Sequence, residues 1–456
     1  MNIKSVFLRR LRRHARKIRL CASNDRVLIA LRRVRVYHYH EFLRCSALPC
    51  WLMMTYKSDS KMPDMVVVAR DVWGTMKRRR HFLSLEWARD RRILFVEPPV
   101  SLPRLISGRP DSLSRFGAIL KPPVEVEKNI FSFTPLRPFP ESVPYAPLAN
   151  AAAFNRQVAT AMRKAGFVRP VLWITPEYGA SLLSSVSHSV SVYDITDDWS
   201  TAGITPSHRD RIVRDDALML RRADIVFAVS ESLRDSKRHL RQDVRLMPNG
   251  ARIDLYEDPP PPPPPPLNSI KRPIVGYAGT VHPDRVDVPL IKKIARLASD
   301  EFSLVFVGPC LLPSKDVSAL ESIHNIHFIP AQSMETLPAF ISNFDVCAIP
   351  HLLTPFTHSL DPIKVYEYLA AGRPIVSTPV KGIMGLSEFI DIAEDAEGFY
   401  SVIKKALTGE EKSNAAARRA EAQKHTWRRR AESIDAIIRS HLENHPGQKN
   451  WLNIAK

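Results

Sequence analysis

A chain of 456 residues with 45% apolar content is too long for one ordinary core and predicts two or three globular domains. Its formal net charge of +19 is concentrated, because residues 1–61 hold 15 Lys and Arg against 3 Asp and Glu, whereas the rest hold 51 against 44. The basicity therefore belongs mainly to one terminal segment, which argues against a nucleic-acid-binding body.

Residues 1–62 form a basic extension, and we expect it to be poorly ordered because the pattern of a folded domain begins only at Met65. Its stretch VFLRRLRRHARKIRL could form a basic amphipathic helix in peripheral contact with an anionic membrane. A transit peptide and a later translation start are alternatives. No apolar run approaches the ~20 residues that span a bilayer. Five cysteines without a CxxC pair or zinc spacing favour a cytoplasmic setting.

From Met65 onward, short β-branched runs alternate with segments of helical length. Near-continuous apolar strands separated by helices predict parallel sheets that are covered on both faces. Eleven such strands exceed one comfortable sheet, so the fold class is α/β with two doubly wound, Rossmann-like domains facing across a cleft. The predicted strands lie in residues 65–72, 92–99, 170–176, 190–197, 223–230, 243–250, 273–280, 302–309, 326–331, 344–350 and 373–380.

The domain boundaries follow from a run of eight prolines, which favours an extended polyproline II spacer and cannot join a sheet. A final helix is predicted near the carboxyl terminus, with Trp427, Ala431, Ile434, Ile437 and Ile438 on or near one face. The predicted segments are a first domain at 63–256, a linker at 257–270, a second domain at 271–400 and carboxyl-terminal helices at 401–445.

In the first domain, polar groups follow two predicted strands. KRRRH opens the first helix, and His81 is a candidate contact for an anionic acceptor, although a solvated basic face is the simpler interpretation. Three aspartates of VYDITDDWS could act as a base, accept sugar hydroxyls or bind a metal, and one of them is expected to cap the next helix. Asn249 lies in a turn at the mouth of the cleft. The aspartates are Asp194, Asp197 and Asp198.

In the second domain, VGYAGTVHPDR combines a strand with a glycine turn. Gly279 would let the backbone approach a ligand closely, although the turn lacks the full GxGxxG of a dinucleotide site. Arg285 stands in the loop before the next helix, where a permanently charged guanidinium could grip a diphosphate. Asp287 is expected to cap that helix.

The stretch SLDPIKVYEYLAAGRPIVST contains an acid inside an apolar segment. Asp361 and Pro362 predict the start of a helix, and Gly372 predicts its end. Lys364 and Glu367 are three residues apart and share a face near the amino-terminal end, where free N–H groups and the helix dipole favour an anion. A surface ion pair is the alternative.

From about Met65 to His441, the order of these motifs resembles retaining glycosyltransferases of the two-Rossmann GT-B architecture, in family 4 and its bacterial branch of teichuronic-acid type. The resemblance implies transfer of a sugar from a nucleotide-diphosphate donor to a polysaccharide, lipid-linked glycan or similar acceptor. The leaving phosphate would be stabilised electrostatically, without a metal or another cofactor. The motifs are WGTMKRRRH, LFVEPP, VYDITDDWS, ADIVFAVSESL, MPNG, VGYAGT, LVFVGP and PIKVYEYLAAGRPIVST.

The resemblance also implies roles for single residues. Glu367 corresponds to the acid that accepts hydrogen bonds from the donor ribose. Arg285 stands where the family often has a phosphate-binding lysine, and Lys364 would add a second positive charge. The second domain would hold the donor, the first domain would hold the acceptor beside His81 and Asn249, and the last helix would pack back on the first domain.

Three departures from the family pattern bear on the donor site. Ser359 replaces the first acid of the paired-glutamate motif, for which Asp361 could substitute. Thr280 replaces the arginine after the glycine turn. Asp194 or Asp197 occupies the place of the usual histidine and is the candidate catalytic group. Two alternatives therefore remain: a non-catalytic nucleotide- or glycan-binding protein, and a nucleotide-sugar epimerase of the same architecture.

Overall fold

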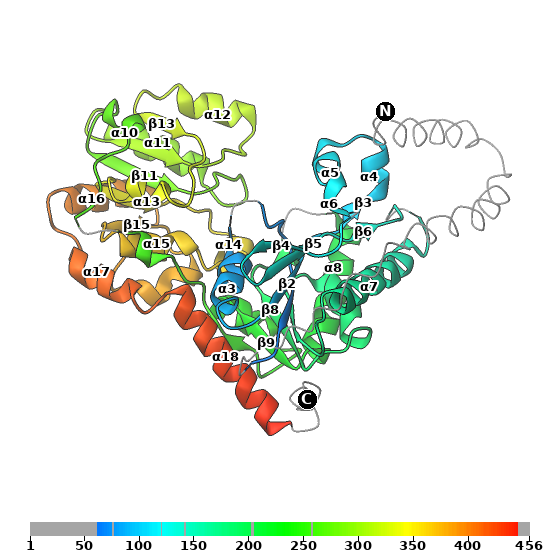
Figure 1. Cartoon of the computed structure of the whole chain (residues 1–456). Coiled ribbons are helices and arrows are strands. Elements are labelled where there is room, and N and C mark those ends of the chain that lie inside the picture. Colours follow the sequence, from blue (N-terminus) through cyan, green and yellow to red (C-terminus); the bar gives the residue numbers. More distant parts are fainter. Residues whose placement is uncertain are drawn as a thin grey trace.

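A computed structural model describes residues 62–445, apart from 75–76, 120, 141–142, 202–204 and 257–258. The predicted basic extension, except for Met62, therefore lies outside the described residues. Two α/β domains lie beside each other, and the long helix α18 (Trp427–Asn444) runs from the second domain onto the first (Figure 1).

The first domain is built on an eight-stranded sheet in the order β10-β9-β8-β7-β1-β2-β5-β4. All six predicted strands are present and pair in parallel. Strands β4 and β5 were not predicted; they pair with each other in antiparallel fashion at the sheet edge, where every residue of β4 is exposed. The strands are β1 Met65–Val68, β2 Ile93–Val96, β4 Val124–Glu127, β5 Ile130–Phe133, β7 Val171–Ile174, β8 Val190–Ile195, β9 Ile225–Ala228 and β10 Arg245–Leu246.

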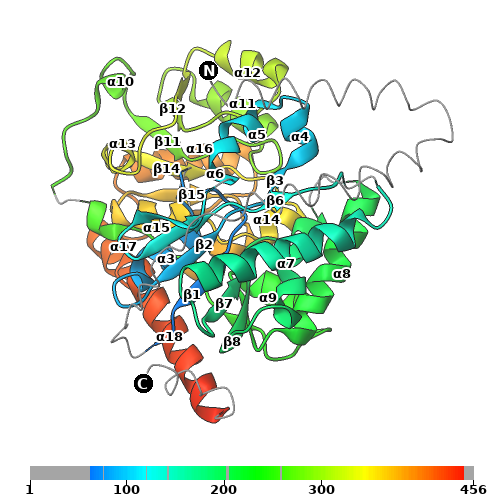
Figure 2. The same ribbon diagram turned by 45° about the vertical axis from the view of Figure 1, so that its right-hand side comes forward.

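Helices cover both faces of this sheet, as Figure 2 shows. On one face, α3 (Arg79–Trp87) packs against α18, with the rings of Phe82 and Trp427 stacked at 5.2 Å. The other face is covered by α7 (Ala146–Lys164), α8 (Pro206–Arg222) and α9 (Glu231–Lys237). Shorter elements complete the domain: β3 Val100–Ser101, α4 Leu102–Ile106, α5 Pro110–Ser114, α6 Phe116–Ile119, β6 Leu136–Arg137, η1 Glu177–Ser184, η2 Trp199–Thr201 and η3 Ile253–Leu255.

The second domain is built on a six-stranded, entirely parallel sheet in the order β13-β12-β11-β14-β15-β16. The five predicted strands are confirmed, and the two-residue edge strand β16 is additional. The strands are β11 Ile274–Ala278, β12 Ser303–Val307, β13 Ile326–Ile329, β14 Val346–Ile349, β15 Ile375–Ser377 and β16 Asp391–Ile392. The helices are α10 Pro265–Asn268, α11 Val288–Ala298, α12 Ser314–Glu321, α13 Leu337–Ile341, α14 Pro355–Ser359, α15 Ile363–Ala370, η4 Lys381–Leu386, α16 Ala396–Leu407 and α17 Ala415–Ala422.

Each sheet has one point where the strand order reverses. The chain adds strands outward from β1 on one side and from β7 on the other, and it does the same from β11 and β14 in the second sheet. Ligands of open parallel sheets bind beyond the carboxyl ends of the strands at such switch points. The loops after β1 and β7 and those after β11 and β14 are therefore where binding sites are expected.

Three predicted boundaries are wrong. Ala251 and Tyr256 pack into the core of the second domain, so the first domain ends before 256. Leu267 joins the same core, 2% exposed, because the last two prolines begin a helical turn, α10, instead of an extended spacer. The limit at 400 cuts through α16, whose Ile403 is fully buried. Around the proline run, burial of Ala251, Tyr256 and Leu267 decides where the second domain begins, although the prolines alone predict an extended linker there.

Gly276 in the central strand β11 provides a test of core packing. A Cβ atom there would lie 2.1–2.3 Å from ring atoms of Phe344, which is fully buried. We expect Gly276→Ala to lower the free energy of unfolding by about 3 kcal/mol, because overpacked cores force neighbouring groups to shift. Urea denaturation measures the loss. Gly385→Ala is the control, since nothing lies within 4 Å of its added Cβ; equal midpoints for the two variants would contradict the predicted clash.

Candidate donor site and domain junction

Two glycine turns shape the carboxyl end of the second sheet. Gly279 follows β11 with φ of +127°, and Gly308 follows β12 with φ of +144°; side chains rarely adopt either conformation. A Cβ atom on Gly308 would lie 2.4 Å from the carbonyl oxygen of Gly279. A Cβ atom on Gly279 would lie 3.2 Å from Nζ of Lys364, so the lysine amine sits directly over this turn.

Lys364, Arg285 and Glu367 form a charged group beside the turn. Nζ of Lys364 lies 3.4 Å from the ring centroid of Tyr277, and burial together with the Arg285 guanidinium holds the pKa of Lys364 well below its usual value. Burial raises the pKa of Glu367 to about 7, against the opposing charge of Lys364. Two cations beside a glycine turn suit an anion such as a diphosphate.

His351 belongs to the same place and was not predicted. It follows β14, is 2% exposed, and neither ring nitrogen has a hydrogen-bond partner among the described residues. Burial, and then the charges of Lys364 and Arg285, lower its pKa well below the usual value, so the imidazole is neutral. Its position directly after the predicted strand FDVCAIP, at the carboxyl end of a central strand, was the signal that could have found it.

Gly279, Arg285, Lys364 and Glu367 thus lie around one switch point, whereas Ser359 does not. Its hydroxyl donates to the carbonyl oxygen of Phe356 at 2.7 Å, and its own carbonyl accepts from Ser230 of the first domain at 2.7 Å. Ser359 is therefore a domain contact in this structure. Ser230 also caps α9, because its hydroxyl accepts from the amide of Leu233.

Thr280 lies next to Gly279 and is partly exposed. Its carbonyl oxygen accepts from the hydroxyl of Tyr277 at 3.1 Å. Asp287 caps α11, as predicted, by accepting from the amide of Leu290.

Asp361 is also turned away from the donor turn. One carboxylate oxygen accepts from the amide of Asn249 at 2.5 Å, and the other accepts from the hydroxyl of Tyr366 at 2.7 Å. The predicted cap is wrong, because α15 begins after Pro362 and receives no side-chain cap. Burial raises the pKa of Asp361 to about 6. The contact with Asn249 holds the two domains together, and Asp361 has no free oxygen with which to replace the missing acid.

Asp194 and Asn249 meet at a buried arginine. Asp194 is fully buried and accepts from Nε of Arg79 at 2.9 Å and from Nη2 at 3.0 Å. Nη1 of Arg79 donates to the carbonyl of Pro248 at 3.0 Å and to the side chain of Asn249 at 3.3 Å. These contacts correct two predictions: Asp194 has no oxygen open to a substrate, and Asn249 joins domains instead of lining an acceptor site. We call Arg79, Asp194, Asn249, Asp361 and Tyr366 the junction network.

His81 is fully buried as well, so its prediction as an acceptor contact is wrong. Nδ1 accepts from the amide of Arg78 at 3.0 Å, which leaves the proton on Nε2 facing the carbonyl of Val72 at 3.2 Å. The ring stacks on Phe95 at 5.1 Å, and burial lowers the pKa of His81 to about 4. The neutral imidazole anchors the start of α3.

The remaining aspartates of VYDITDDWS differ in accessibility. The carboxylate of Asp198 accepts a hydrogen bond from the amide of Ser200 at 3.2 Å at the start of η2, as expected for a helix cap. Asp197 is partly exposed, and its carboxylate accepts from the hydroxyl of Thr196 at 2.9 Å. Among the described residues, no group of three or more His, Cys, Asp and Glu could hold a metal ion.

Comparisons with known proteins place these features in a class. Residues 272–408 match the family described as Glycosyl transferases group 1. Sucrose-phosphate synthase from Thermosynechococcus elongatus superposes with a TM-score of 0.64 at 15% identity, over 84% of this chain and 100% of that one. Anabaena HepE in complex with UDP-glucose superposes with a TM-score of 0.60 at 15% identity, over 83% and 99%. The second domain is therefore a group 1 (family 4) glycosyltransferase domain, and the whole fold is GT-B.

A more specific relative comes from Bacillus subtilis (strain 168). The chain is 27% identical over 224 residues to the putative teichuronic acid biosynthesis glycosyltransferase TuaH, with 46% of this chain and 55% of the relative covered. The match thus spans about half the length of that relative, and the homology is distant. In the part of the chain that the structure describes, no helix is long and apolar enough to cross a membrane.

Proposed function

We propose that this protein transfers a sugar, with retention, from a nucleoside-diphosphate donor to a hydroxyl of a polysaccharide, lipid-linked glycan or similar acceptor. The observation that carries the proposal is the convergence of Gly279, Arg285, Lys364, Glu367 and the unpartnered His351 at the β11/β14 switch point. The family match covers the same residues, and UDP-glucose is bound in the similar HepE structure.

In this proposal the ionised Glu367 accepts hydrogen bonds from both ribose hydroxyls of the donor. Lys364, Arg285 and the amino-terminal end of α15 hold the diphosphate. As the bond to the sugar breaks, negative charge grows on the leaving diphosphate, and the same cations stabilise it without moving. Asp197, in place of Asp194, is the carboxylate available to an acceptor hydroxyl.

The test is a thermal-shift screen of the full chain against UDP, GDP, ADP and CMP. A nucleotide that binds the native state at a hundredfold excess over its Kd adds about 2.7 kcal/mol to stability. We expect one nucleotide to raise the Tm and the others to leave it unchanged. No shift with any of them would refute a nucleotide-sugar site.

Donor binding is expected to depend on pH through Glu367. Its pKa of about 7 before binding must fall when ribose hydroxyls bind the charged form, so donor affinity is full above pH 7 and weakens below it. Below pH 7, the loss of donor affinity approaches about tenfold for each pH unit. Titration calorimetry with UDP-glucose, if uridine is the base, is suitable because this donor lacks the phosphate monoester that titrates near pH 6. A slope that survives in Glu367→Gln would assign the effect to another group.

A non-catalytic nucleotide-binding protein is the second candidate, favoured by the side chain of Ser359, which is turned to Phe356 instead of toward a donor sugar. The two candidates differ in one measurement. A transferase slowly hydrolyses its sugar nucleotide without acceptor, whereas a binding protein shows the nucleotide shift but releases no sugar.

A further inference from the structure

A row of four side chains crosses from the first domain to the donor site of the second. Arg70 follows β1, forms an ion pair with Glu177, and places its guanidinium 5.3 Å from the ring centroid of Trp199 in η2. The ring of Trp199 lies 6.1 Å from that of Phe356 in α14, and Phe356 lies 5.8 Å from the guanidinium of Arg285. These separations are typical of cation–π and aromatic contacts. We call the four residues the aromatic bridge.

The donor end of the aromatic bridge is the guanidinium of Arg285. No hydrogen bond or ion pair joins this guanidinium to any described residue, and it lies over the face of Phe356, whose side chain is buried. The main chain of Arg285 is fixed separately, since its carbonyl oxygen accepts from the amide of Leu352 at 2.8 Å. A ring face orders a guanidinium without using its N–H donors, so all of them stay available to an anion. Phe356 therefore orients Arg285 before a ligand binds.

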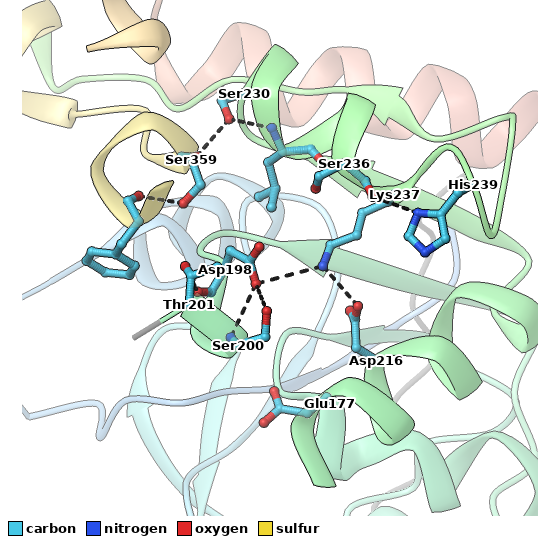
Figure 3. Close-up of polar contacts among 12 residues, drawn as sticks. Glu177, Asp198, Ser200, Thr201, Asp216, Ser230, Ser236, Lys237, His239 and Ser359 are labelled. Atoms are coloured by element: carbon cyan, nitrogen blue, oxygen red, sulfur yellow. Dashed lines mark hydrogen bonds and ion pairs between the residues drawn. The ribbon is translucent and has the colours of Figure 1, made fainter. Parts of the chain in front are cut away.

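Polar contacts hold both partners of the ring contact between the domains. On the side of the first domain, Nζ of Lys237 lies 3.9 Å from Asp198, directly before η2, and 3.0 Å from Asp216 (Figure 3). On the side of the second domain, the carbonyl of Ser359, the last residue of α14, accepts from Ser230 of the first domain at 2.7 Å (Figure 3). Helix α14 is thus tied to the first domain beside η2, which keeps the two rings together.

We propose that Trp199 is a positioning residue for donor binding, because it packs against Phe356 and so fixes the guanidinium that holds the diphosphate. A side chain of the first domain would then complete the phosphate site of the second domain. The inference rests on the proposed transferase function and adds to it a residue that acts through another.

Isothermal titration of the full chain with UDP, GDP, ADP and CDP finds the diphosphate that binds the wild type, and the variants are compared with that nucleotide. Trp199→Ala should weaken it about three- to tenfold, as expected when one aromatic contact is lost beside a cation. Trp199→Phe keeps a ring and should stay within about twofold of the wild type. Tyr145→Ala removes a ring that is 82% exposed and should leave the affinity unchanged.

A double-mutant cycle assigns the effect to Arg285. In an Arg285→Ala background, Trp199→Ala should cause no further loss, because the guanidinium that it positions is gone. Trp199→Leu replaces the alanine variant if the latter does not fold, and the same losses are expected. Unchanged affinity without the Trp199 ring would overturn the proposal, as would losses that multiply in the double variant. Failure of the wild type to bind any of the four diphosphates would instead refute the transferase function, and this inference with it.

Discussion

Replacing Glu367 by alanine or glutamine is expected to weaken nucleotide binding strongly while leaving the fold intact. Each hydrogen bond to a charged group contributes about 1.5–3 kcal/mol, so loss of two ribose contacts weakens affinity roughly a hundredfold or more. Stability should not suffer. Burial raises the pKa of Glu367 to about 7 from 4.5, so its contribution to stability is present below pH 4.5 and is lost as the pH rises through 7. At pH 8, replacing Glu367 by the neutral glutamine therefore does not lower the free energy of unfolding.

Isothermal titration of wild type and variant with the nucleotide that gives the thermal shift measures this effect. Glu388→Gln is a suitable control, because Glu388 is an exposed acid of the same domain. Full affinity in Glu367→Gln would remove Glu367 from the donor site. A variant that binds less but also melts at a much lower temperature would point to a structural role instead.

Replacing Arg79 by alanine is expected to have the largest effect on stability. The change leaves Asp194 fully buried without its partner and removes the bonds to Pro248 and Asn249. Breaking one side of a buried ion pair typically costs about 3–5 kcal/mol, because the remaining charge is desolvated and uncompensated. Urea denaturation measures the loss of free energy of unfolding.

A comparison of three variants isolates the cause. Arg79→Met combined with Asp194→Leu removes both charges and should cost less than Arg79→Ala alone. Arg89→Ala breaks an ion pair with Glu86 at 3.1 Å in which the arginine is 59% exposed, and it should cost less than about 1 kcal/mol. Equal losses for Arg79→Ala and Arg89→Ala would show that the junction network does not stabilise the protein.

Tertiary contacts decided the roles of most polar candidates. Asp194 lies near the end of a strand, Asn249 follows one and Asp361 precedes a helix, and these positions are equally typical of a ligand contact and of a structural one. Their partners are distant in sequence: Asn249 pairs with Asp361, 112 residues away, and Asp194 pairs with Arg79, 115 residues away. No local pattern carries that information. His351 was missed because a lone histidine belongs to no recognisable motif, and its position after a central strand was the only local signal.

The sequence alone determined the architecture and the centre of the donor site. All eleven predicted strands are present, because a strand buried on both faces needs a continuous apolar run; the exposed, alternating VEVE of β4 does not carry that signal. The sequence alone could predict that Lys364 and Glu367 lie on one face of the same helix, because spacing along a helix is a local property. The junction between the domains arises from contacts between residues more than a hundred positions apart, and only the folded chain brings those groups within hydrogen-bonding distance.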